Sequence, residues 1–293
     1  MGTRLEMATK GIVLFAKNNE EIDYIKLAKI CALCIKKSMG DIPIALVCDQ
    51  EEVKQSSDKH LSLFDQLIPQ PKTIGQNRKT FWGNGEKKLL TYHNLSRPSV
   101  YELTPYEETL LIDSDFIVQN NSLNDVWGSG EDMLMNYQVR TISGEPFNLS
   151  DRRLSDFGPK MYWATVAYFR KSHYCQLFFD LVKAIRKNYL FYSKSYYLLS
   201  PDLYRNDYAW SIAAHLLSDT KRESIPPLPG EVMLSSLEQD RLVSMSTQQL
   251  NFLASLNNGE NYLPVNVKGS NVHIMNKFDL LNNYPQFLDI YGG

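Results

Sequence analysis

The 293-residue sequence has few of the features that mark membrane, secreted or nucleic-acid-binding proteins. Its apolar runs are far shorter than the roughly 18 to 20 residues that a membrane-spanning helix needs, and no signal-peptide pattern precedes the first of them. Its formal net charge is -2, so the chain as a whole has no basic field for nucleic acid or an anionic membrane, which leaves room only for a local basic patch. These absences predict a cytoplasmic protein without membrane insertion.

Cysteine is also scarce, with four residues in the whole chain: Cys31, Cys34, Cys48 and Cys175. Cys31 and Cys34 have the C-x-x-C spacing of metal and redox sites. They lie, however, in a stretch with helical periodicity, and no second cysteine pair completes a zinc site. We therefore interpret them as reduced, partly buried core cysteines.

The first part of the chain predicts a βαβ unit without a dinucleotide fingerprint. Apolar residues 11–16 predict a buried parallel strand, residues 21–37 an amphipathic helix and residues 42–48 a second strand. No G-x-G-x-x-G follows the first strand, which excludes a dehydrogenase-type nucleotide site.

Polar residues follow both of these strands, where open α/β sheets bind their ligands. Lys17 and Asn18 come directly after the first strand, and Asp49 closes the second. A carboxylate at such a position can accept two hydrogen bonds from ribose hydroxyls. We expect Lys17, Asn18 and Asp49 to meet a nucleotide.

Two carboxylates, Asp113 and Asp115, interrupt the apolar run L-L-I-D-S-D-F-I-V over residues 110–118. Such runs normally exclude charge, because burying an unpaired carboxylate is costly. In an extended chain residues i and i+2 point to the same side, so both carboxylates could converge on one divalent cation. The alternative interpretation is a strand end followed by an Asx turn.

The rest of the chain predicts further alternating elements. A polar, Gly-rich loop over residues 75–85 is predicted to open a helix over residues 86–95, and long helices are predicted over residues 173–189 and 204–217. Five aromatic residues lie close together after residue 188, and aromatic faces either stack on sugars in an acceptor groove or fill a core. They are Tyr189, Phe191, Tyr192, Tyr196 and Tyr197.

No internal repeat or interdomain linker divides the chain. We expect residues 7–293 to form a single α/β domain with a Rossmann-type mixed sheet flanked by helices. Residues 7–120 would form its nucleotide-binding half and residues 121–293 its acceptor half. Residues 1–6, which precede a second methionine, are interpreted as an expression-tag remnant.

Residues 106–118 give the sequence a resemblance to a known family. A tyrosine, a hydrophobic strand, D-x-D and further hydrophobics stand here as Y-E-E-T-L-L-I-D-S-D-F-I-V. This block resembles the GT-A fold glycosyltransferases, most closely the glycogenin-like retaining group; the likeness covers most of the chain in element order, but only this block is specific. It implies a GT-A-like fold and transfer of a hexosyl or pentosyl group from a nucleoside-diphosphate sugar with retention of configuration.

The resemblance also implies a metal site. Asp113 and Asp115 would hold Mn²⁺ or Mg²⁺, which binds the diphosphate and neutralises the charge of the leaving group. His273, between Val272 and Ile274, resembles the third metal ligand of the family, although a histidine so flanked is also typical of a satisfied structural residue. Lys277, in a shorter and altered version of the family pattern, is the candidate diphosphate ligand.

Two further residues are carried over by the resemblance. Lys88 matches the family's lysine on the helix before the D-x-D strand, which contacts donor phosphates or sugar; its alternative is plain solvated surface. Asp207, within R-N-D-Y, matches an Asp-Gln pair and would contact the sugar or assist the departing and arriving groups, with a helix N-cap as the alternative. Trp163-Ala164-Thr165 replaces the family's Asn-Ser-Gly, so the acceptor site is expected to differ.

The acceptor is left open between a glycan, a protein, a lipid and a modified nucleobase. Two other functions also remain open. A nucleotidyltransferase on a related α/β scaffold would use carboxylate-bound metal as well, but normally has a Gly-rich loop after the first strand, and K-N-N-E over residues 17–20 is not one. The other is a non-catalytic protein that binds a nucleotide or a glycan.

Overall fold

The computed structural model describes residues 9–55, 62–73, 77–83, 86–147, 152–156, 158–198, 203–218, 225–256 and 259–292. The expected tag remnant, residues 1–6, lies outside the described residues. Among the described residues no helix combines the length and the apolar character that crossing a membrane requires.

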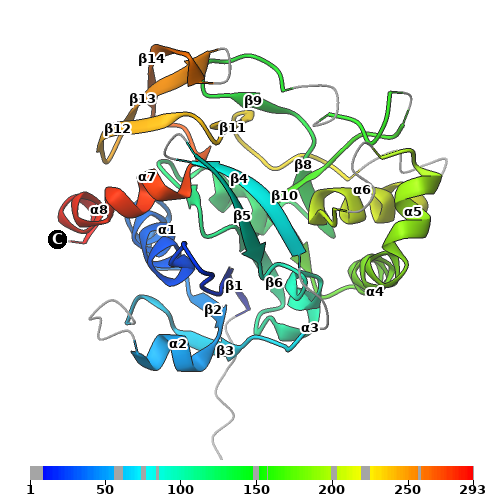
Figure 1. Ribbon diagram of the computed structural model, residues 1–293. Coiled ribbons are helices and arrows are strands. Elements are labelled where there is room, and N and C mark those ends of the chain that lie inside the picture. Colours follow the sequence, from blue (N-terminus) through cyan, green and yellow to red (C-terminus); the bar gives the residue numbers. More distant parts are fainter. Residues whose placement is uncertain are drawn as a thin grey trace, which may run out of the picture.

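The central sheet has six strands in the order β3-β2-β1-β6-β10-β8 (Figure 1). β1, β2, β3 and β6 are parallel to one another, whereas β10 is antiparallel to both β6 and β8. The predicted mixed α/β sheet is therefore confirmed. The bounds of its strands are Lys10–Ala16 (β1), Ile44–Cys48 (β2), Gln66–Pro69 (β3), Glu108–Ile112 (β6), Met133–Asn136 (β8) and Trp163–Arg170 (β10).

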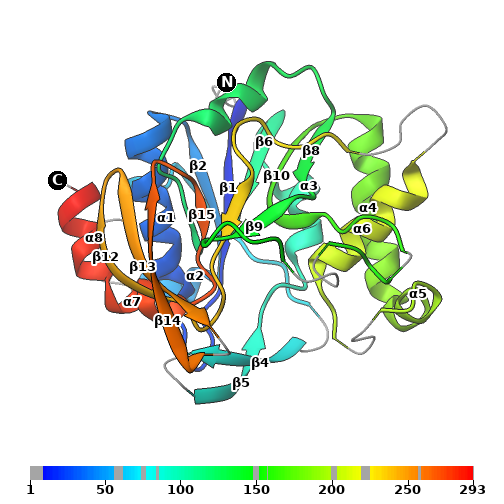
Figure 2. The ribbon, with the colours of Figure 1, turned by 90° about the horizontal axis from the view of Figure 1, so that it is seen from above.

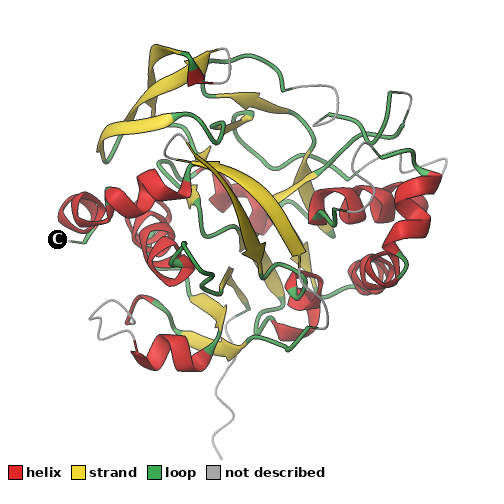
Figure 3. Cartoon of the chain, in the orientation of Figure 1, coloured by secondary structure: helices red, strands yellow, loops and turns green. Residues whose placement is uncertain are grey.

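Figure 2 shows helices on both sides of this sheet, with α1, α7 and α8 on the left and α4, α5 and α6 on the right. α1 packs against β1, β2 and the C-terminal helices α7 and α8, whereas α6 packs against β10 and α4 (Figure 3). The predicted helix over residues 173–189 ends two residues earlier, because Asn188 leaves helical geometry and a separate helix, α5, follows. The helix bounds are Tyr24–Met39 (α1), Gln50–Gln55 (α2), Val100–Leu103 (α3), His173–Lys187 (α4), Tyr189–Ser195 (α5), Asn206–Leu217 (α6), Lys277–Asn282 (α7) and Tyr284–Tyr291 (α8).

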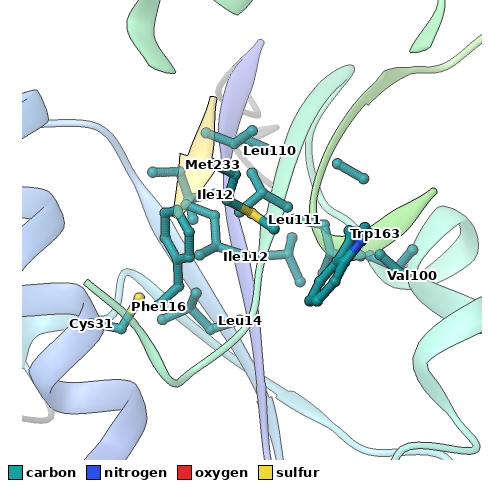
Figure 4. Packing of buried hydrophobic residues seen from close by; sticks show 14 of the residues in the cluster. Ile12, Leu14, Cys31, Val100, Leu110, Leu111, Ile112, Phe116, Trp163 and Met233 are labelled. Carbon is teal, nitrogen blue, oxygen red and sulfur yellow. The ribbon is translucent and has the colours of Figure 1, made fainter. Parts of the chain in front are cut away.

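The core is one continuous cluster, and one part of it lies between α1 and the first strands of the sheet. Both faces of β1 and β6 are covered, which is why these parallel strands are apolar along most of their length. Their fully buried residues include Ile12 and Leu14 of β1 and Leu110 and Ile112 of β6. Figure 4 shows these four side chains, with Cys31 of α1 near Leu14 and Phe116. All four cysteines of the chain are free, and they are buried completely rather than partly.

Two smaller sheets bring the C-terminal third of the chain over the central one. β15 pairs with β7 and β11, and β9 completes this four-stranded sheet. A second, antiparallel sheet consists of β12, β13 and β14. The bounds are Phe116–Ile117 (β7), Val139–Thr141 (β9), Met233–Ser235 (β11), Arg241–Ser246 (β12), Gln249–Leu256 (β13), Asn261–Lys268 (β14) and Val272–His273 (β15).

The prediction of a loop over residues 75–85 and a helix over residues 86–95 is wrong where the structure describes it; residues 75, 76, 84 and 85 lie outside the described residues. The chain forms an antiparallel pair of strands, β4 (Asn77–Gly83) and β5 (Glu86–Tyr92). The residues E-K-K-L-L favour a helix locally, but Phe81 of β4 is completely buried and its ring contacts that of Phe278, with centroids 5.6 Å apart. Tertiary packing of this kind overrides intrinsic helix propensity.

Candidate active site

The two aspartates lie in a turn at the carboxyl end of β6. β6 ends at Ile112, the backbone N–H of Asp113 donates to the Thr165 carbonyl on β10, and the N–H of Phe116 donates back to the Asp113 carbonyl. β7 then starts at Phe116. This turn is closed by a main-chain hydrogen bond, whereas the Asp113 side chain accepts from Arg97. It places both carboxylates at the edge of the sheet where open α/β folds bind ligands.

His273 reaches this turn through strand pairing. β15 runs antiparallel to β7, with His273 opposite Phe116, and the N–H of Ile274 donates to the Asp115 carbonyl. Nε2 of His273 lies 3.4 Å from Oδ1 of Asp115. Asp113, Asp115 and His273 each offer one ligand atom, and these atoms lie within 4.8 Å of one another. The three ligand atoms are therefore close enough to one another to bind one cation together.

Two buried cations hold the aspartates. Arg97, in the 3-10 helix Arg97–Ser99, forms an ion pair with Oδ1 of Asp113 and donates to the Ala164 carbonyl at 2.6 Å. Nζ of Lys277, the first residue of α7, lies 2.7 Å from Oδ2 of Asp115. Each aspartate therefore has its own basic partner, from opposite sides of the turn.

These surroundings shift the pKa values of the two carboxyl groups in opposite directions. Burial raises the pKa of Asp113 to about 6, against the opposing attraction of Arg97. Burial also acts on Asp115, but the nearby ammonium group of Lys277 and the imidazole of His273 outweigh it and hold the pKa of Asp115 well below its ordinary value. Burial likewise disfavours the charged form of Lys277, yet Asp115 raises the pKa of Lys277 above its ordinary value. Asp115 and Lys277 are a mutually stabilised ion pair.

A serine fixes the orientation of the histidine ring. Nδ1 of His273 lies 3.2 Å from Oγ of Ser235, the residue that pairs with it on β11, and Oγ of Ser235 donates to the Ser236 carbonyl. The single hydroxyl proton of Ser235 is thereby used, so Oγ accepts from Nδ1–H. This assignment from the hydrogen-bond network leaves Nε2 facing the aspartates.

A cavity of about 420 Å³ opens in front of these residues. It is lined from both halves of the chain, and Lys17, Arg97, Asp113, Asp115, Asp207, His273 and Lys277 are among its lining residues. Phe147 and Trp163 form an aromatic wall, with ring centroids 5.0 Å apart. The five aromatic residues after residue 188, for which an acceptor groove and a core were both considered, do not line the cavity: Tyr189 is buried, and Phe191 and Tyr197 are exposed.

Asp207 faces the cavity from the first turn of α6. Its Oδ1 accepts from the N–H of Ala164 at 2.9 Å, and its Oδ2 lies 3.1 Å from NH2 of Arg205. The N-cap of α6 is Arg205, so the N-cap alternative for Asp207 is wrong. Ala164 thus joins the two sides of the cavity, because its N–H binds Asp207 and its carbonyl accepts from Arg97.

Three of the expected site residues do not reach the cavity wall. Lys88 lies on β5 rather than on a helix, and its Nζ forms an exposed ion pair with Glu21 at 2.9 Å. Asn18 uses its side-chain oxygen to accept from the N–H of Ile25 near the start of α1. Asp49 pairs with Lys17, whose Nζ lies 3.6 Å from Oδ2 of Asp49.

Arg97 is the basic residue that sequence reasoning missed. It lies in the short polar stretch N-L-S-R-P-S, which has no periodicity and carries no charge other than Arg97. The cluster of lysines around residue 88 was a stronger local signal, and it belongs to a solvated strand. The one available signal for Arg97 was an isolated charge between the predicted elements.

Comparison with known proteins gives matches in structure alone. No protein-family model matches the sequence, and no curated protein matches it. Similar solved structures include the galactosyltransferase LgtC in complex with donor and acceptor sugar analogs, with a TM-score of 0.45, 11% identity, and coverage of 96% of this chain and 95% of that one. The glycosyltransferase GlyE of Streptococcus pneumoniae TIGR4 gives a TM-score of 0.39 and 16% identity over 75% of this chain, which spans 45% of the length of GlyE. The 4-diphosphocytidyl-2C-methyl-D-erythritol synthase of Anaerococcus prevotii DSM 20548 gives a TM-score of 0.40 and 12% identity, over 79% of this chain and 91% of that one.

Proposed function

We propose that this chain is a metal-dependent, GT-A-like glycosyltransferase that moves a sugar from a nucleoside-diphosphate sugar to an acceptor. The observation that carries the proposal is the convergence of Asp113, Asp115 and His273 on the wall of a 420 Å³ cavity. Carboxylate oxygens with one imidazole nitrogen suit Mn²⁺ or Mg²⁺. Ligand atoms within 4.8 Å of one another can all reach one ion at roughly 2.0 to 2.6 Å.

The charge of the site supports a diphosphate as the ligand that accompanies the cation. Asp113 and Asp115 are already balanced by Arg97 and Lys277. A divalent cation alone would add two uncompensated positive charges to a largely buried cluster, which is unfavourable. A diphosphate brings the matching negative charge, so cation and nucleotide are expected to bind together. When bound, the cation would stabilise the charge that develops on the leaving diphosphate.

The remaining residues take roles that follow from their places in the cavity. Lys277 is proposed to contact the diphosphate, and Arg97 to position Asp113 and the Ala164 carbonyl. Asp207, held by Ala164 and Arg205, is proposed to face the transferred sugar, and Lys17 to face the nucleotide. Retention of configuration and a hexosyl or pentosyl donor are proposed from the likeness of residues 106–118 to the glycogenin-like group.

The proposal is tested by measuring release of nucleoside diphosphate from a panel of nucleotide sugars with Mn²⁺. We expect turnover with at least one donor, its loss on chelation, and its loss in Asp113→Asn. Asp180→Asn, which changes an exposed aspartate on α4, is the matched control and should leave turnover intact. Donor binding that is independent of metal and gives no turnover would indicate a binding protein. Release of pyrophosphate from a nucleoside triphosphate and a sugar phosphate would indicate a nucleotidyltransferase.

A further inference from the structure

One short helix, α5, exposes large apolar side chains beside basic ones. Leu190 is 51% exposed and Phe191 68% exposed on its outward side, and Tyr197, just beyond its end, is 81% exposed. Lys194 lies on the same side, and Lys187 precedes the helix at the end of α4. We call Lys187, Leu190, Phe191, Lys194 and Tyr197 the α5 face. In Figures 1 and 2 α5 lies at the outer edge of the molecule, beyond α4 and α6.

The α5 face is positively charged on a chain that is negatively charged overall. Between Asp180 and Asp202 the sequence contains four basic residues and no acidic one, against a net charge of -2 for the whole chain. Two of the four have partners: Lys183 pairs with Glu102 and Asp180, and Arg186 donates to the Leu95 carbonyl. The other two are Lys187 and Lys194. Both are exposed, and neither has an ion-pair partner within the part of the chain that the structure describes.

We propose that the α5 face docks on the surface of an anionic lipid bilayer. Aromatic rings partition to the level of the lipid headgroups, where their apolar bodies and polar tips are both satisfied. Lysines beside them gain electrostatic attraction from anionic headgroups. The face combines a phenylalanine, a tyrosine and a leucine with two unpaired lysines and no acid, which is the composition that such a surface binds.

Charge also argues against a second copy of this chain as the occupant. A symmetric dimer through the α5 face would bring the same patch of both subunits together, so Lys187 and Lys194 would face other lysines. The bilayer offers the complementary charge.

Docking through this face would bring the rim of the cavity near the bilayer. The hydroxyl of Tyr189 on α5 donates to the Leu203 carbonyl at 2.9 Å, and its ring contacts that of Tyr204, with centroids 5.1 Å apart. Leu203 and Tyr204 both line the cavity. Under the proposed function this favours an acceptor displayed at a membrane surface; the docking itself does not depend on that function.

The test is co-sedimentation of the full chain with vesicles, without metal or nucleotide, so that its outcome is independent of the proposed activity. Vesicles of phosphatidylcholine are compared with vesicles that also contain phosphatidylglycerol. We expect binding to the second kind and weaker binding as salt is raised, because salt screens the attraction of the lysines. Wild-type protein that stays in the supernatant with both kinds overturns the proposal.

Variants then locate the surface. Lys187→Gln and Lys194→Gln should each weaken binding about fivefold, since a basic residue near an anionic surface contributes about 1 kcal/mol. Phe191→Ser combined with Tyr197→Ser should weaken it by about tenfold or more, because exposed rings lose the apolar part of the contact. Lys268→Gln and Leu263→Ser change residues of the same types on β14, where Leu263 is 47% exposed, and should bind as wild type.

Two results would contradict the location. Binding that falls equally in the β14 controls would show a general charge effect. Self-association of the wild type that Phe191→Ser removes would show that a second copy covers the face. A cooperative thermal unfolding transition like that of the wild type, followed by circular dichroism, shows that each variant is folded.

Discussion

The two aspartates of the candidate site lie one residue apart and have very different surroundings. Asp115 is nearly sealed, with its side chain 7% exposed between Lys277 and His273, whereas the side chain of Asp113 is 32% exposed toward the cavity and is held by Arg97. The partners of Asp115 come from the C-terminal end of the chain, and those of Asp113 from segments nearer in the sequence. The difference suggests a division of work, in which the Asp115 side anchors the turn and the Asp113 side meets the ligand.

Removing the cation of the sealed side should have the largest effect. Lys277→Met removes the ion-pair partner of the buried Asp115 carboxylate, and we expect it to lower the free energy of unfolding by about 3–5 kcal/mol. Arg97→Met should cost less, about 1–3 kcal/mol, because water in the cavity can solvate Asp113. Urea denaturation in the presence of a chelator measures both. If Arg97→Met were less stable than Lys277→Met, the Asp113 side rather than the Asp115 side would anchor the turn.

Changing the open side should affect ligand binding more than stability. Asp113→Asn removes a proposed ligand charge, while the amide oxygen can still accept from Arg97, which also keeps its bond to the Ala164 carbonyl. We therefore expect Mn²⁺ binding in the presence of a nucleoside diphosphate to weaken by roughly a hundredfold or more, beyond the loss typical of outer-shell changes. Titration followed by electron paramagnetic resonance of Mn²⁺ measures this. If Asp113→Asn bound Mn²⁺ with wild-type affinity, Asp113 would not be a metal ligand and the two aspartates would have only a structural role in the turn.

The orientation of His273 should have a smaller effect. Ser235→Ala removes the acceptor for Nδ1–H, so the ring can rotate and adopt the other tautomer. We expect about tenfold weaker Mn²⁺ binding with unfolding little changed. Ser235→Thr, which keeps the hydroxyl, is the conservative control. Equal loss in both variants would indicate a packing defect at β11 rather than a loss of orientation.

The smallest effect is expected at the lysine that the sequence pointed to. Lys88 is 38% exposed and pairs with Glu21 at the surface. Lys88→Met should leave Mn²⁺ binding unchanged and alter the free energy of unfolding by less than about 0.5 kcal/mol. A large loss of binding in Lys88→Met, with little in Arg97→Met, would restore the original assignment.

Much of the fold around the site could be predicted from the pattern of neighbouring residues in the sequence. Continuous apolar runs predicted β1 and β2 with α1 between them, and the spacing of Asp113 and Asp115 predicted two carboxylates on one side of a strand end. The likeness of residues 106–118 to a known family pointed to His273 and Lys277, and the structure places both beside Asp115. These features are readable because burial and periodicity leave their mark within a few neighbouring residues.

What the tertiary structure alone decided depends on contacts between distant segments. Arg97 becomes a partner of Asp113 only because the 3-10 helix that carries it packs beside the start of β10. Residues 86–92, with helical propensity in isolation, become a strand because Phe81 of the neighbouring strand packs on Phe278 near the other end of the chain. Such contacts leave no pattern in either segment by itself, because their free energy arises only when both are buried together.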